Sequence, residues 1–431
     1  MGKFDIENVT ALRVWDSRGR PTVEVDISLA GGALGRAIAP AGASRGMHEA
    51  VDLRDGGKKF GGWDVTHALR GIDVEIKEIL IGQDVREQER LDKLMIELDG
   101  TPTKQRLGGN ATVAVSMALA HAAAAAEGVP LWRHLIGPDV KAEDIRLPLP
   151  EIQIFGGGAH ASRRVDVQDF MVIAIGATTF AEALDRTAEV YRHAGLIMAD
   201  AGKLAGVADE GGFWPDFDGN EEALETLVRA IEAAGYTPGQ DVAISLDIAA
   251  SEFGKNGTYT LARDDKTLSS EEMCAMMIDW MERYPIVSIE DPLGEDDPDG
   301  LMKFTWAIGD KAQIVGDDVL VTNADRARAA AKDKLCNTLL VKPNQAGTLT
   351  EAKAACDAAA NAGMGRIVSA RSGETEDVTI VHLAVGWQAP QLKVGSFARS
   401  ERMVKWNEGL RIAEALGGDG PLHPKSAFQW R

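Results

Sequence analysis

The chain of 431 residues carries a formal net charge of −20. This charge argues against a nucleic acid partner, because the phosphate backbone would be repelled. No apolar run approaches the about 20 residues that a membrane span needs, and the first residues lack the layout of a signal peptide, so we expect no membrane partner. The three cysteines, Cys274, Cys336 and Cys356, are widely spaced, which favours buried thiols and a cytoplasmic location.

The N-terminal part of the chain is predicted to contain antiparallel strands. From Thr22 to Ala30 apolar and polar side chains alternate, which is typical of a strand buried on one face. Turn-forming residues from Asp16 to Pro21 would join this strand to the one before it. A third strand leads into a loop from Ala41 to Ala50, whose two glycines let the backbone approach a ligand closely. The three strands are expected over residues 11–15, 22–30 and 35–40.

Two helical patterns follow these strands. One lies around residues 85–99, and the other runs from Asn110, the expected N-cap, to a stop at Gly128. Strands followed by helices predict an N-terminal α+β capping domain over residues 1–135. A polar segment would separate it from a second domain over residues 140–431.

The second half of the chain repeats a strand–helix rhythm. Six short β-branched or leucine-rich runs alternate with helical patterns, and each carries a charged residue near its carboxyl end. In an eight-fold α/β barrel the carboxyl ends of the strands converge on one rim. We therefore expect an active site at this rim, formed by Asp247, Glu290, Asp317, Lys342, Arg371 and Lys393.

The start of the second domain is less regular. Two strands flank a glycine-rich loop with His160, and the second strand carries Gln168 and Asp169. Two helices follow, the second with Asn220 as its expected N-cap, and a glycine-flanked acidic pair between them contains Glu210. These helices are expected over residues 178–200 and 220–234.

The charged strand ends suggest metal-dependent acid–base chemistry. Asp247, Glu290 and Asp317 offer the oxygen ligands that Mg²⁺ prefers; alternatively, each carboxylate caps a neighbouring helix. Lys342 is a candidate base, because a metal ion and Lys393 nearby would lower its pKa. A lysine that bridges two of the carboxylates fits the same position equally well.

The remaining candidates have a functional and a structural interpretation. Arg371 and Ser372 resemble an anion clamp, or Arg371 forms a structural pair with a carboxylate. Glu210 would be a general acid on a flexible loop or a solvated turn residue. His160 taken alone is more typical of a loop histidine than of a catalytic one.

Nine motifs, in order across nearly the whole chain, resemble the enolase family, and the resemblance extends from residue 9 to about residue 415. The resemblance implies a small α+β domain that caps an eight-fold α/β barrel, in a homodimer or homo-octamer. It also implies a Mg²⁺-dependent lyase for an anionic small molecule, 2-phosphoglycerate or phosphoenolpyruvate or a close analogue, with a Lys or His base. The motifs are GASRGMHEA, VQDFM, DEGG, SLDIAASEF, RYPIVSIEDP, QIVGDD, LLVKPNQAGTLTE, RSGETED and GSFARSER.

The resemblance implies a role for each matched position. Asp247, Glu290 and Asp317 would hold one Mg²⁺, and Ser44 would help to hold a second Mg²⁺ when substrate binds. Lys342 would take the proton alpha to the substrate carboxylate. Two cations on one carboxylate would stabilise the negative charge that this step creates.

Other matched positions would contact the substrate. Glu210 would help the 3-hydroxyl group to leave, and Lys393 would lie near the substrate carboxylate. Arg371 and Ser372 would hold the phosphate. The matched residues that would line the pocket are His160 and Gln168.

The chain departs from the family at the leaving-group and phosphate end. Ala370 replaces a histidine, and Asp169 replaces a glutamate near the departing hydroxyl. An alternative is therefore an enolase paralogue of the type of carboxyphosphonoenolpyruvate synthase, from phosphinate-antibiotic biosynthesis. A third possibility, a non-catalytic binding protein, is opposed by the intact metal ligands and Lys342. Further departures are Arg45 for a threonine, Gly156 for an asparagine and Ala208 for a glycine.

Overall fold

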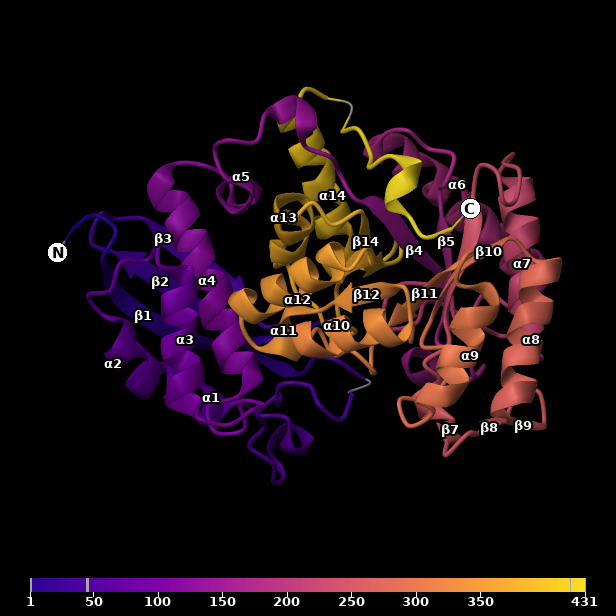
Figure 1. The fold of residues 1–431 in the computed structure, drawn as a ribbon, viewed down its shortest axis with the longest axis horizontal. Coiled ribbons are helices and arrows are strands. Elements are labelled where there is room, and N and C mark those ends of the chain that lie inside the picture. The colour runs from indigo at the N-terminus through magenta and orange to yellow at the C-terminus, as the bar shows by residue number, and fades with distance from the viewer. Residues whose placement is uncertain (1, 44–45, 419, 431) are drawn as a thin grey trace.

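The computed structural model describes residues 2–43, 46–418 and 420–430. A three-stranded antiparallel sheet with helices comes first in the chain, and a closed eight-stranded barrel follows it (Figure 1). The predicted fold class, an α+β domain followed by an eight-fold α/β barrel, is thus confirmed. The domain limits 1–135 and 140–431 stay predictions, and Ser44 and Arg45 lie outside the described residues.

The N-terminal sheet has the predicted strands in the order β1-β2-β3, each antiparallel to the next. The polar face of β2 is less exposed than the alternation predicts, because Arg36 on β3 lies against Glu24 and Asp26. The strands are β1 (Ile6–Trp15), β2 (Pro21–Leu29) and β3 (Leu34–Ile38).

Helix α4 (Gly109–Glu127) packs against this sheet, and its small side chains allow a close approach. A Cβ atom on Gly35 of β3 would lie 2.2 Å from both the Ala118 carbonyl oxygen and the Ala122 nitrogen. Contrary to expectation, α4 is long and apolar enough to span a membrane, but 83% of the apolar window is buried inside the fold. It is therefore a core helix. The other helices of this part are α1 (Thr66–Arg70), α2 (Lys77–Leu80), α3 (Gln88–Asp99) and α5 (Leu131–Ile136).

Neither asparagine predicted as an N-cap has that role. Gly108 precedes α4. The Asn110 side chain instead accepts the backbone N–H of Leu53 and donates to the carbonyl oxygen of the same residue. Gly219 precedes α7, and Asn220 Oδ1 instead accepts the backbone N–H groups of residues 166 and 167. An asparagine side chain can bond to any nearby backbone group. Its contacts in the folded chain, and not its position before a helix, therefore determine whether it acts as an N-cap. The contact of Asn220 fixes the segment that leads into β5.

The barrel closes in the order β10-β11-β12-β13-β14-β4-β5-β6. Neighbouring strands are parallel except β5, which is antiparallel to both β4 and β6. Asp169, the first residue of β5, therefore lies beside Asp247, the last residue of β6. The strands are β4 (Leu149–Gly156), β5 (Asp169–Ile173), β6 (Ala243–Asp247), β10 (Ile286–Glu290), β11 (Gln313–Gly316), β12 (Thr338–Val341), β13 (Gly365–Ser369) and β14 (Gln391–Gly395).

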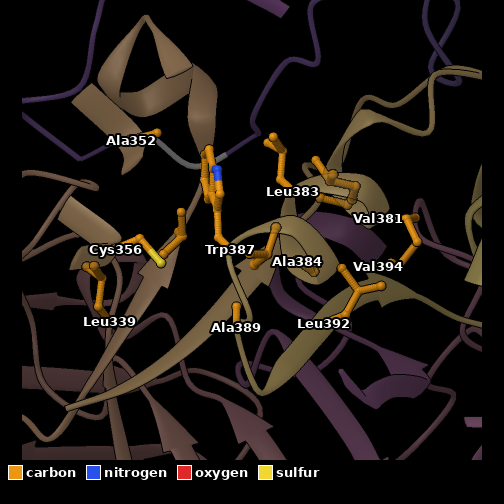
Figure 2. Packing of buried hydrophobic residues seen from close by; sticks show 14 of the residues in the cluster. Leu339, Ala352, Cys356, Val381, Leu383, Ala384, Trp387, Ala389, Leu392 and Val394 are labelled. Atoms are coloured by element: carbon orange, nitrogen blue, oxygen red, sulfur yellow. The ribbon is translucent and has the colours of Figure 1, made fainter. Parts of the chain in front are cut away.

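Helices follow most of these strands, and their apolar faces pack on the barrel. Figure 2 shows this layer, in which Leu383 and Ala384 of α13 and Trp387, which follows this helix, belong to the same buried cluster as Leu392 of β14. The three cysteines are free, as predicted; Cys336 and Cys356 are buried, whereas Cys274, which was also expected to be buried, is only partly so. A small sheet, β7 (Gly254–Lys255), β8 (Thr258–Leu261) and β9 (Lys266–Ser269), precedes α8. The helices are α6 (Phe180–Asp200), α7 (Asn220–Ala233), α8 (Ser270–Arg283), α9 (Pro298–Ile308), α10 (Ala324–Asp333), α11 (Pro343–Ala346), α12 (Leu349–Asn361), α13 (Thr379–Gly386) and α14 (Ser400–Ala415).

Candidate active site

Most of the residues predicted from the sequence line one cavity at the rim of the barrel. Glu290 and Asp317 are buried and bond the lysines of this cavity. The rim gathers these residues because most of the parallel strands carry a polar residue at, or within two residues of, the carboxyl end, and because β5 runs in the opposite direction and starts there. The predicted lining residues are His160, Gln168, Asp169, Glu210, Asp247, Lys342, Arg371, Ser372 and Lys393.

Lys393 lies among three carboxylates. Its Nζ is 2.9 Å from Asp247 Oδ2 and 2.7 Å from Glu290 Oε2. A third carboxylate oxygen, Asp169 Oδ2, is 3.5 Å away. Burial alone would lower the pKa of Lys393, but the carboxylates outweigh burial and raise this pKa well above its ordinary value. Lys393 is thus a fixed positive charge in the centre of the site.

Lys342 forms an ion pair with Asp317. Burial lowers the pKa of the amine, but the Asp317 carboxylate raises it more, so the net shift among the protein groups is upward. The prediction that its surroundings lower this pKa is therefore wrong for the protein alone, since the nearest charge is an anion. Gln345 Nε2 donates to the other oxygen of Asp317 at 2.8 Å.

The three predicted metal ligands fit a hard cation. Asp247, Glu290 and Asp317 are all buried, and Glu290 Oε1 has no hydrogen-bond partner among the described residues. Burial, followed by the charge of Asp247, raises the pKa of Glu290 well above its ordinary value. Buried carboxylates of this kind are costly without a cation. Helix capping does not explain them, because they bond Lys393, Lys342, Gln168 and Gln345 instead.

Asp291 is a site residue that the sequence analysis missed. Its two carboxylate oxygens accept the backbone N–H groups of Asp317 and Asp318, each at 2.9 Å. Burial and the charge of Asp317 raise the pKa of Asp291 to about 8. Asp291 thus braces the turn that presents Asp317. The only signal in the sequence is its place directly after Glu290.

His160 lies between two acids that also line the cavity. Its Nε2 is 3.8 Å from both Asp169 Oδ1 and Glu210 Oε1. Burial raises the pKa of Asp169 to about 6. Burial also acts to raise the pKa of Glu210, but the charges of His160 and nearby cations outweigh it and lower this pKa. The two acids therefore differ in proton affinity, which suits one acid and one base.

Gln153 on β4 ties these two acids together. Its Nε2 donates to Asp169 Oδ1, and its Oε1 accepts the backbone N–H of Gly212, in the loop of Glu210, at 2.8 Å. A Cβ atom on Gly212 would lie 2.5 Å from Gln153 Oε1, so glycine permits this approach. Gln153 could not be predicted from local sequence patterns, because its partners are distant in the chain.

Two of the departures from the enolase pattern fit each other. A Cβ atom on Gly156 would lie 2.7 Å from the Ala208 Cβ. A larger side chain at position 156 would therefore collide with Ala208, and the two changes form a compensating pair. Ala370 lines the cavity, where it offers a methyl group and no hydrogen-bonding side chain.

Arg371 is both the predicted clamp residue and a partner of a carboxylate. Its Nη1 donates to Glu49 Oε2 at 3.1 Å. The neighbouring Ser372 Oγ accepts the backbone N–H of Ala43 at 3.0 Å. Arg402, which is fully buried, donates to the carbonyl oxygens of Arg371 and Ser372 at 2.7 and 2.6 Å. Glu49 and Arg402 were missed, although both lie within the quoted motifs.

Comparison with known proteins agrees with this geometry. Residues 6–135 match the family model "Enolase, N-terminal domain", and residues 144–430 match "Enolase, C-terminal TIM barrel domain". "Enolase 1" of Desulfitobacterium hafniense (strain Y51) is 49% identical over 431 residues, which is 99% of this chain and 98% of that protein.

Proposed function

Because this chain belongs to the enolase family and is a hydro-lyase of that family, we propose that it converts 2-phosphoglycerate into phosphoenolpyruvate with Mg²⁺. The observation that carries the proposal is the shared cavity. A candidate base, Lys342, a candidate acid, Glu210, and a candidate anion clamp, Arg371, all line it. This is the set that removal of a proton and a hydroxyl group from a phosphorylated acid requires.

Asp247, Glu290 and Asp317 are the proposed ligands of the first Mg²⁺, and a second ion would bind with the substrate, helped by Ser44. When bound, Mg²⁺ would polarise the substrate carboxylate and stabilise the charge that develops as the adjacent C–H bond breaks. Lys393 would add a positive charge at the same carboxylate, since it already contacts Asp247 and Glu290.

The proposed reaction moves one proton and one hydroxyl group. Lys342 Nζ takes the proton from C2, and Glu210 gives a proton to the C3 hydroxyl group, which leaves as water. Glu210 must first gain that proton, which the charge of His160 and the nearby cations, by lowering its pKa, oppose. Before it can act as a base, Lys342 must lose its own proton, which the charge of Asp317 opposes. Arg371 and Ser372 would bind the phosphate and so fix C2 and C3 between base and acid.

The direct test is turnover of 2-phosphoglycerate. With Mg²⁺ present, the ultraviolet absorbance of the enol phosphate is expected to rise, and a chelator is expected to stop the rise because the ligand carboxylates lose their cation. Absence of turnover, with Mg²⁺-dependent binding of phosphoenolpyruvate still measurable, would contradict this substrate. The predicted homodimer or homo-octamer and the cytoplasmic location stay predictions.

A second candidate is an enolase paralogue that makes a phosphonate analogue of phosphoenolpyruvate. Two observations favour it: Ala370 leaves a methyl group on the cavity wall, and the short side chain of Asp169 is held by Gln153. Both residues line the cavity in which the phosphate and the leaving group are proposed to sit. A roomier cavity would suit a different phosphorus group.

The double variant Ala370→His with Asp169→Glu separates the two candidates. If the site accepts 2-phosphoglycerate and has only drifted, turnover is expected to rise at least about tenfold, because the added groups reach the leaving hydroxyl and the phosphate. The measurement is kcat/KM for 2-phosphoglycerate, with each single variant as a control. No gain, together with loss of turnover of a phosphonate analogue, would favour the second candidate.

A further inference from the structure

Glu49 pairs with Arg371 through both of its oxygens. It lies in the segment between β3 and α1 and is 8% exposed. Its Oε2 accepts from Arg371 Nη1 at 3.1 Å, and its Oε1 is 3.4 Å from Arg371 Nη2. A carboxylate that faces a guanidinium in this way fixes the orientation of the guanidinium plane. The residues are far apart in the sequence, so the contact links the N-terminal part of the chain to the barrel.

The Glu49 carboxylate is itself held in place. Its Oε1 accepts the backbone N–H of Gly46 and Nε2 of Gln345, both at 3.1 Å. Gln345 Nε2 also donates to Asp317 Oδ1 at 2.8 Å, and Thr322 donates to Gln345 Oε1 at 2.7 Å. One amide group therefore connects the partner of Arg371 with a proposed metal ligand.

Further hydrogen bonds hold the edge of the Arg371 guanidinium that faces Glu49. Its Nη1 donates to Asn344 Oδ1 at 3.0 Å in addition to Glu49, which accounts for both N–H groups of that nitrogen. Glu49 is not among the residues that line the cavity, whereas Arg371 is. Glu49 can thus hold one edge of the guanidinium from outside the cavity that Arg371 lines.

We propose that Glu49 is a positioning residue for anion binding, which orients Arg371 toward the phosphorus-containing group of the substrate and connects that orientation to Asp317 through Gln345. This inference rests on the proposed function, because it takes Arg371 as the anion clamp. A lone arginine as buried as Arg371 would be unstable without a counter-charge. Glu49 supplies that counter-charge without entering the cavity.

The first test measures anion binding and turnover in Glu49→Gln. The variant keeps the size of the side chain but loses its charge and one acceptor, so the Kd for inorganic phosphate and the KM for 2-phosphoglycerate are expected to rise about tenfold. A smaller fall in kcat is expected. Glu49→Asp, which keeps the charge, should recover part of the affinity. Unchanged phosphate affinity in Glu49→Gln would overturn the proposal.

Glu24→Gln is the matched control. Glu24 is also 8% exposed and lies 3.7 Å from an arginine, Arg36, but outside the cavity. Its phosphate affinity and KM are expected to equal those of the parent protein. An equal loss in both variants would show a general effect on the fold and would overturn the positioning role.

A second readout needs no substrate. Phenylglyoxal modifies arginine, and mass spectrometry can follow the reaction at Arg371 in the ligand-free protein. Without the Glu49 charge, Arg371 is expected to react at least about fivefold faster, since its guanidinium is less firmly held. An unchanged rate would overturn the proposal. If the parent protein binds phosphate but does not turn over 2-phosphoglycerate, only the proposed function is contradicted. The positioning role of Glu49 is then still tested by this modification rate and by the phosphate affinity.

Discussion

Replacement of Lys342 with alanine is expected to abolish exchange of the substrate C2 proton with solvent, a fall of about 10³-fold or more. Lys342 Nζ is the proposed base, and the methyl group of alanine cannot accept a proton. Binding of Mg²⁺ is expected to remain, because Asp317 keeps its contact with Gln345 and its backbone support from Asp291. The measurement is deuterium incorporation at C2 by NMR, with Mg²⁺ binding followed by calorimetry.

A surface variant, Lys353→Ala, serves as the control, since Lys353 pairs only with its helical neighbour Asp357 among the described residues. It should exchange at the parent rate. Undiminished exchange in Lys342→Ala would remove this lysine as the base. Loss of both exchange and Mg²⁺ binding would instead assign it a role in assembling the metal ligands.

Replacement of Lys393 with alanine is expected to destabilise the metal-free protein by about 3–5 kcal/mol, because buried carboxylates lose their paired cation. Turnover is expected to fall about 10²–10³-fold, since a positive charge beside the substrate carboxylate is lost. Urea unfolding with and without Mg²⁺ checks the first expectation. Mg²⁺ should stabilise this variant more than the parent, because it replaces the missing charge at Asp247 and Glu290.

Lys393→Arg provides the matched comparison, since it retains the charge in a different shape. Its stability should stay near that of the parent while its turnover falls. If Lys393→Ala were as stable as the parent without Mg²⁺, then Lys393 would not be the group that neutralises Asp247, Glu290 and Asp169.

The rim residues were predictable because each follows a local rule. An apolar run that ends in a charge, as at Glu290 or Lys342, places that charge at one edge of a parallel barrel regardless of distant contacts. The direction of β5 was not predictable in this way. The direction of β5 relative to β4 depends on the path of the segment before Asp169. Asn220 fixes that segment through hydrogen bonds to residues 166 and 167, and these long-range contacts cannot be recognised in the sequence.

The supporting residues could not be found from local pattern at all. Glu49 and Arg371 are separated by 322 positions, and neither neighbourhood indicates the other. The same limit explains why the direction of the pKa shift of Lys342 was predicted wrongly. The sequence placed cations near this lysine but could not show that Asp317, an anion, is its direct partner. Local rules therefore locate the reacting groups, and long-range packing decides their protonation and orientation.

The closure of the barrel has a consequence for synthesis on the ribosome. Strand β4 pairs with β14, and Leu149 lies opposite Gln391. One edge of β4 therefore stays unpaired until the last barrel strand has been synthesised. At about 5–20 residues per second, that edge stays unpaired for roughly 10 to 50 s after it emerges. Strand β14 also carries Lys393, so the nascent chain acquires its active site only when translation is nearly complete. Until then the unpaired edge of β4 can pair with a strand of another nascent chain.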